Sequence, residues 1–178
     1  YTATELTTAK LIATRMNVEP KMRDEYFIAG LLHDIGKIVL NRKLPDLFLE
    51  CIRESDIRRI PLHVAEEGKM EINHARVGAM VAAKWQLSGS LAEAITFHHN
   101  PLEAGPDHRR VVYTVSVANA FCVLNELGFS GSRYADEIPD EIASNLRISE
   151  DALVGMREKI AEELEKALVF LAVSERGA

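Results

Sequence analysis

Four of the six histidines stand in short motifs whose residue types suit metal binding. His33 and Asp34 are adjacent in LLHDIGK, His74 lies in NHARVG, and His98 and His99 are adjacent in FHHNP. Neutral imidazole nitrogens bind iron, manganese, zinc and nickel, and a carboxylate can bridge two such ions. Together these five residues indicate a site for a divalent transition metal.

Each motif also has an ordinary structural alternative. Asp34 lies in an apolar helical run, where an unpaired carboxylate is costly to bury. A bound metal would offset its charge, and so would Lys37, three residues further along. His33 or His74 alone would more often be a hydrogen-bonded core residue. The HH pair alone could mark a helix terminus, where the dipole favours cationic imidazoles.

The order of the motifs resembles the HD superfamily of metal-dependent phosphohydrolases and, more fully, its HDOD branch. AGLLHDIGKIVL (29–40), NHARVGAMVAAKW (73–85), QLSGSLAEAITFHHNP (86–101) and VSVANAF (115–121) carry the resemblance, over about two thirds of the chain. It implies an all-α multi-helix bundle of HD-superfamily type. It also implies a bacterial, cytoplasmic signal-transduction module that acts through protein partners and lacks demonstrated turnover.

Two positions depart from the active HD families. By resemblance, those enzymes carry a first His at a position equivalent to Tyr1 or just upstream, and a closing Asp that aligns with Asn119. We therefore expect a partly dismantled site that binds one divalent ion, of Fe, Mn, Zn or Ni, or none. The residues that match the second metal site of the dinuclear HD-GYP enzymes are Asp34, His74, His98 and His99.

Three functional hypotheses follow. The first is a regulatory module of HDOD type, with protein partners, a nucleotide-like ligand as a further occupant, and oligomerisation left open. The alternative is a metal-dependent phosphohydrolase acting on a nucleotide or cyclic dinucleotide, with Asp34 and Lys37 as its catalytic residues. HHNPLEAGPDHRR lacks the GYP motif, although Arg109 and Arg110 could hold phosphate if they are not simply solvated. The third is an all-α packing domain with a vestigial motif.

Composition and net charge restrict the kinds of partner that we expect for this chain. The 178-residue chain has a net charge of −6, so it lacks the basic excess with which proteins bind duplex nucleic acid. No apolar run approaches the roughly 18 residues of a membrane span. Cys51 and Cys122 lie far apart in apolar patterns, which indicates buried, reduced thiols of a cytoplasmic protein. We expect one domain over 1–178, cut from a longer chain because it starts at Tyr1.

Apolar residues recur at intervals of three and four, which predicts helices throughout. We expect a single helix over 21–40, a helix 73–85 capped by Asn73, a buried helix over 111–128, and a surface loop over 129–140. We also expect Trp85 in the core, and His63 and His108 at the surface. Further helices are expected over 2–16, 45–57, 63–68, from Ser88 or Ser90 to 100, 141–146, and an amphipathic 150–174 that packs on the domain or forms a dimer seam.

Overall fold

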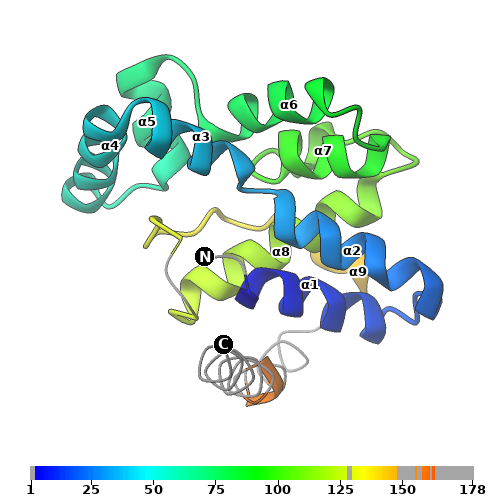
Figure 1. Ribbon diagram of the computed structural model, residues 1–178. Helices are drawn as coiled ribbons and strands as arrows, with labels where there is room; N and C mark the ends of the chain where they lie inside the picture. Colours follow the sequence, from blue (N-terminus) through cyan, green and yellow to red (C-terminus); the bar gives the residue numbers. More distant parts are fainter. Residues whose placement is uncertain (1–2, 128–129, 148–154, 156–157, 161, 163–178) are drawn as a thin grey trace, which may run out of the picture.

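The computed structural model describes residues 3–127, 130–147, 155, 158–160 and 162, and every regular element among them is helical (Figure 1). This confirms the all-α prediction. None of the described helices is both long and apolar enough to cross a bilayer. The elements are α1 (Ala3–Arg15), α2 (Pro20–Leu32), α3 (Ile35–Lys43), α4 (Pro45–Arg58), α5 (Leu62–Met70), α6 (His74–Lys84), α7 (Gly89–Phe97), η1 (Pro101–Glu103), α8 (Arg109–Leu124) and α9 (Asp140–Leu146).

The single helix expected over 21–40 is wrong, because the chain turns a corner at His33 and Asp34. α2 ends at Leu32 and α3 begins at Ile35. Asp34 leaves helical geometry, with φ −96° and ψ 13°. The apolar pattern continues across the corner because both helices bury a face, so periodicity alone could not reveal the break. The corner places His33 and Asp34 at a junction, where both side chains are buried.

A contact between two glycines brings α3 against α6. A Cβ on Gly36 would lie 1.9 Å from the His74 carbonyl oxygen and 2.8 Å from the Gly78 amide nitrogen. A Cβ on Gly78 would lie 2.6 Å from a methyl group of Ile95 on α7. Only residues without side chains permit this approach. The DIG and H-x-x-x-G motifs are therefore packing motifs as well as candidate ligand motifs.

α8 is the central helix, as predicted. Every residue from 111 to 122 is buried, and α8 packs against α1, α2 and α7. In Figure 1, α1 and α2 run side by side along one part of the molecule, while α6 and α7 form a neighbouring pair and α4 and α5 another. The expectation that this helix continues to Gly128 is wrong: α8 ends at Leu124, and residues 125–126 form a turn.

Other expectations had mixed outcomes. Asn73 caps α6 as predicted, since its side-chain oxygen accepts a hydrogen bond from the Arg76 amide at 2.9 Å. Cys51 and Cys122 are buried free thiols. The prediction that Trp85 lies in the core is wrong: it is 56% exposed, because the buried stripe of α6 ends one turn earlier, at Ala82. Most of the predicted helix over 150–174, including its packing or dimer seam, lies outside the described residues.

Candidate metal centre

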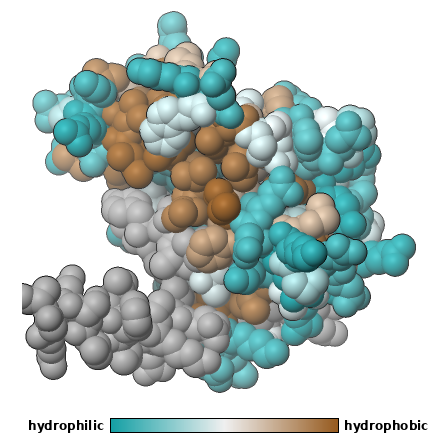
Figure 2. Space-filling model, turned by 45° about the vertical axis from the view of Figure 1, so that its right-hand side comes forward, coloured by the Kyte–Doolittle hydropathy of each residue, from teal (hydrophilic) through white to brown (hydrophobic). Residues whose placement is uncertain are grey.

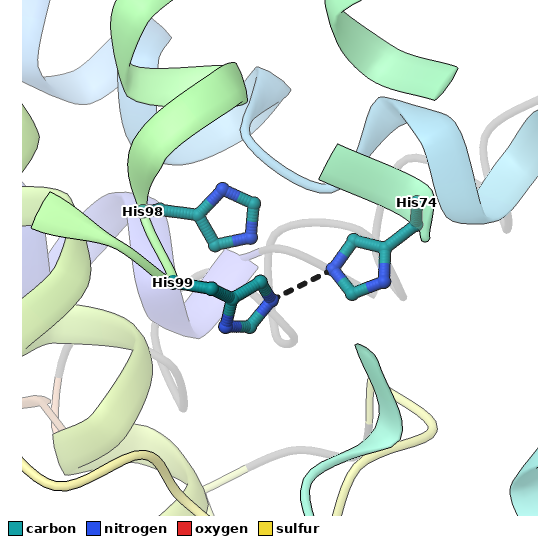
Figure 3. A group of neighbouring side chains, drawn as sticks. All are labelled: His74, His98 and His99. Carbon is teal, nitrogen blue, oxygen red and sulfur yellow. Dashed lines mark hydrogen bonds between the residues drawn. The ribbon is translucent and has the colours of Figure 1, made fainter. Parts of the chain in front are cut away.

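The five predicted ligand residues converge from three places in the fold. His33 and Asp34 occupy the corner between α2 and α3, and His74 is the first residue of α6. His98 and His99 directly follow α7. The α3–α6 and α6–α7 packing contacts bring these places together, and Figure 3 shows the rings of His74, His98 and His99 clustered around one small space.

The two carboxylate oxygens of Asp34 face different neighbours. Oδ1 lies 3.2 Å from Nε2 of His74 and 3.7 Å from Nε2 of His98. Oδ2 lies 3.4 Å from Nε2 of His33 and 2.6 Å from the Lys37 ammonium. His99 is brought into the first group by His74, because their Nε2 atoms are 2.9 Å apart (Figure 3). Asp34 is thus the centre of the cluster.

Backbone carbonyls orient two of the imidazoles. Nδ1 of His33 lies 2.9 Å from the Gly30 carbonyl oxygen, and Nδ1 of His98 lies 2.9 Å from that of Ile95. A carbonyl oxygen only accepts hydrogen bonds, so Nδ1 carries the proton in both rings. In a neutral imidazole the inward Nε2 is then a bare lone pair, and neither Nε2 has a hydrogen-bond partner in the described structure.

Carboxylates orient the other two imidazoles in the same sense. Nδ1 of His74 lies 2.7 Å from Glu66, which also accepts the His74 backbone amide at 2.8 Å. Nδ1 of His99 lies 2.5 Å from Asp136. Carboxylates that accept from the outer nitrogen of a histidine are the usual outer shell of metal-binding imidazoles, because they fix the tautomer and raise ligand basicity. All four rings therefore direct Nε2 inward.

The distance between the His74 and His99 Nε2 atoms tests whether a cation fits. Two facing lone pairs at 2.9 Å repel unless a proton or a metal ion lies between them. Two nitrogens bound at about 2.1 Å to one ion are separated by about 3.0 Å at the 90° angle of octahedral coordination, and by about 3.4 Å at a tetrahedral angle. Oδ1 of Asp34 is likewise buried with no hydrogen-bond partner. These donor atoms fit a divalent transition metal.

The charge balance of the interior points the same way. Among the described residues, the buried acids are Glu5, Asp34 and Glu66, and Lys37 is the one buried Lys or Arg. Buried carboxylates without compensating charge are costly. Lys37 can balance the charge of only one of these three acids. A divalent cation among the imidazoles would offset the negative charge that remains.

The titration properties of the side chains agree with this distribution. Burial alone would raise the pKa of Asp34, but His33 and Lys37 hold it well below its usual value. Burial lowers the pKa of His99 to about 3 and also holds that of His98 far below its usual value. For His74, burial and Lys37 act to lower the pKa, yet the nearby carboxylates raise it overall. The pKa of His74 thus shifts in the opposite direction to those of His98 and His99.

Sequence reasoning missed residues that contact the histidine cluster from outside. The prediction that His63 lies at the surface is wrong, because its side chain is only 11% exposed and its Nε2 lies 2.7 Å from Asp136. Its ring also stacks on His99, with centroids 4.0 Å apart. His108 is half-buried and lies over Gly89. Nothing local in the sequence marks Asp136, which sits in the expected loop and reaches the site only through folding.

Two further polar residues bear on the metal site of the active HD families at which this chain departs from those families. Glu5 on α1 is 3% exposed, and its Oε2 has no hydrogen-bond partner. Burial raises its pKa, while the charges of His33 and Lys37 lower it, so the acid lies within electrostatic reach of the corner. Asn119 on α8 is 7% exposed with an unpartnered oxygen. Tyr1, the position aligned with the first His, lies outside the described residues.

Comparisons with known proteins place this site in a family. The HDOD domain model matches residues 6–101, a range that contains all five predicted ligand residues. An uncharacterised protein of Treponema pallidum (strain Nichols) is 29% identical over 125 residues, which cover 70% of this chain and 24% of that protein. The chain therefore spans about a quarter of the length of this curated relative.

Solved structures with the same fold come from three other bacteria. An HDOD domain protein of unknown function from Geobacter sulfurreducens has a TM-score of 0.67 and 24% identity, covering 98% of this chain and 60% of its own. A protein provisionally assigned to signal transduction, from Marinobacter aquaeolei VT8, has a TM-score of 0.75 and 18% identity, covering 98% and 37%. A protein provisionally assigned as a phosphohydrolase, from Shewanella amazonensis SB2B, has a TM-score of 0.58 and 19% identity, covering 90% and 57%.

The family match extends over more than half of the chain, and its range includes the glycine contact that joins α3 to α6 as well as the histidine motifs. The chain belongs to the HDOD domain family.

Proposed function

We propose that this chain is a regulatory module of signal transduction whose HD site holds one divalent metal ion as a closed centre, without hydrolase turnover. The ligands would be Asp34, His74, His98 and His99, with His33 on the other side of the Asp34 carboxylate. Fe, Mn, Zn and Ni are the ions that suit this donor set. The module would be cytoplasmic and bacterial, as the family resemblance implies.

The observation that carries this proposal is the burial of the ligands. The exposed side-chain fraction is 0% for His33 and His98, 1% for His74, 5% for Asp34 and 7% for His99. Structural metal sites are closed, whereas catalytic sites keep a position open to water or substrate. A nucleotide has no route to ligands this deeply covered unless the fold opens.

Lys37 supports the same conclusion. When a metal is bound, such a site can polarise a phosphoryl oxygen or lower the pKa of a bound water, and a free lysine would then assist by neutralising the phosphate. Here the Lys37 side chain is 6% exposed and its ammonium lies 2.6 Å from Asp34. The lysine is therefore committed to an internal ion pair, which positions Asp34 rather than substrate.

The alternative function remains a phosphohydrolase acting on a nucleotide or cyclic dinucleotide, with Asp34 and Lys37 in catalytic roles. The Shewanella amazonensis SB2B neighbour favours it, while the Marinobacter aquaeolei VT8 neighbour favours signalling. Both are below 20% identity, so neither decides between the two. The closed ligand set makes the regulatory function the better supported of the two.

Protein partners fit the surface of the module. Figure 2 shows apolar residues gathered on one face, and exposed large hydrophobic side chains occur on α2, α3 and α4, including Ile28, Ile38 and Ile57. Apolar surface rimmed by polar residues is typical of protein contact sites. A regulatory module with a metal-braced interior would hold such a surface in a fixed shape.

Elemental analysis of protein purified without chelator tests the metal centre. We expect about one transition-metal ion per chain, its loss in Asp34→Ala, and its retention in the control Asp24→Ala, because Asp24 is a solvent-exposed carboxylate on α2. Metal-free wild-type protein, reconstituted with each ion and still empty, would refute the centre.

A turnover assay separates the two functions. Reconstituted protein is offered bis(p-nitrophenyl) phosphate and a cyclic dinucleotide with Mn, Fe, Zn or Ni. The regulatory proposal expects no hydrolysis above that of Asp34→Ala. Hydrolysis that disappears in both Asp34→Ala and Lys37→Ala would instead establish the phosphohydrolase.

A further inference from the structure

A polar pocket lies at the opposite end of α1 from the metal centre. It has a volume of about 480 Å³ and receives an arginine from each of three elements. Arg15 is the last residue of α1, Arg110 lies in the first turn of α8, and Arg147 follows α9. Asn17 and Asn145 also line this arginine pocket. Arg15 is ten residues beyond Glu5 on α1, which is about 15 Å along a helix.

The three arginines have no ionic partner in the part of the chain that the structure describes. The ion pairs formed there by lysines and arginines all involve other cations. Three guanidinium groups around one pocket repel one another, and this occurs in a chain with an excess of acidic residues. An anion bound between them would remove that repulsion, and the planar forks of arginine suit phosphate oxygens.

The start of α8 supports an anion independently. A helix N-terminus favours acidic residues, because its backbone N–H groups carry a partial positive charge. The first turn of α8 instead begins Arg109–Arg110 and contains no acidic residue, and its N-cap, His108, makes no capping hydrogen bond. An anion bound at this end of α8 would supply the negative charge that the first turn lacks.

We propose that the arginine pocket binds a small soluble ligand with two or more phosphoryl groups, such as a nucleoside diphosphate or triphosphate. Its volume is in the range of small-molecule sites. The arginines would hold the phosphates, and the two asparagine amides offer donors and acceptors to a sugar or base. This site shares no residue with the metal centre and does not depend on it.

Isothermal titration calorimetry of the full 178-residue chain tests the proposal. The probes are inorganic pyrophosphate, ADP and GDP, with inorganic phosphate and sulfate as comparators. We expect pyrophosphate to bind at least tenfold more tightly than either comparator, and Arg110→Gln or Arg147→Gln to weaken it at least tenfold. Arg53→Gln is the matched control, since Arg53 is an exposed arginine on α4 outside the pocket. Asp34→Ala should leave binding unchanged, which separates this site from the metal centre.

Several results would overturn the proposal. Pyrophosphate binding no tighter than that of sulfate, or weakened equally by Arg53→Gln, would reduce the pocket to nonspecific surface charge. Glu150 and Asp151 follow Arg147 closely in the sequence and offer competing carboxylates. If wild-type chain fails to bind while a Glu150→Gln, Asp151→Asn double variant binds, the arginines serve the chain's own acids. Circular dichroism of each variant verifies that the fold is intact.

Discussion

Replacing Gly36 by alanine should disrupt both the packing of α3 on α6 and the metal centre. The added Cβ would lie 1.9 Å from the His74 carbonyl oxygen. The two backbones would have to separate by roughly 1.1 Å for that contact to reach 3.0 Å. His74 begins α6, so the same movement carries its imidazole away from Asp34, where Nε2 and Oδ1 are now 3.2 Å apart.

The magnitude follows from two opposing effects. Alanine is favoured over glycine inside a helix by about 0.5 to 1 kcal/mol, whereas overpacking of a tight contact costs about 1 to 3 kcal/mol and occasionally more. Because three backbone atoms of α6 lie within 3.0 Å of the new Cβ, we expect a net loss near 2 kcal/mol, or about 4 to 8 °C in Tm. Metal bonds tolerate about 0.2 Å of error, so metal affinity should fall at least tenfold.

Gly68 supplies the matched control. It is an exposed residue of α5 with no atom within 4 Å of a built Cβ, so Gly68→Ala should raise Tm by about 1 to 4 °C and leave metal content unchanged. Thermal unfolding by circular dichroism, with and without chelator, and elemental analysis measure both effects. A Gly36→Ala variant that melts at or above the wild-type temperature and retains its metal would refute the packing argument.

Three further perturbations act on the site itself. Glu66→Gln removes the charge that orients His74, so metal affinity measured by chelator competition should fall about 10- to 100-fold. An unchanged affinity would mean that Glu66 has only a structural role. Burial lowers the pKa of His99 to about 3, below the 6.5 of an ordinary histidine, so the unfolded chain binds more protons between these values. Metal-free protein should therefore lose stability as pH falls below about 6.5, and a Tm higher at about pH 5.5 than at about pH 7.5 would contradict this. Lys37→Met leaves the buried carboxylate of Asp34 without its lysine. It should lower the free energy of unfolding of the metal-free protein by about 3 kcal/mol, and that of the metal-loaded protein by less. Equal losses in denaturant titrations of the two forms would argue against charge compensation by the metal.

Much of the fold was predictable from local pattern. Apolar residues at helical spacing indicated an all-helical chain, and the unbroken apolar run in the middle of the sequence indicated the buried α8. Asn73 was identified as an N-cap because its side-chain oxygen can accept a hydrogen bond from an amide of the first turn of α6, three residues away. Such features depend on neighbouring residues, so they can be deduced without knowledge of the tertiary structure.

Patterns that extend over an element were less reliable where tertiary packing intervenes. The corner at Asp34 divides a continuous apolar run, because the chain turns there to bury a second face of the same pattern. Trp85 is exposed although it follows an amphipathic helix, since the buried positions of α6 end at Ala82. Side-chain identity alone could not indicate where the buried stripe ends.

The sequence by itself indicated which residues could bind metal: five candidate ligand side chains in three motifs, all of which the fold brings to one place. The tertiary structure decided how they are held. The Gly36 contact sets the approach of α6, and Glu66 and Asp136 set the direction in which two imidazoles point. These partners are separated by many residues, and a hydrogen bond or a backbone contact between distant segments leaves no periodic trace in the sequence. Only folding brings them within reach.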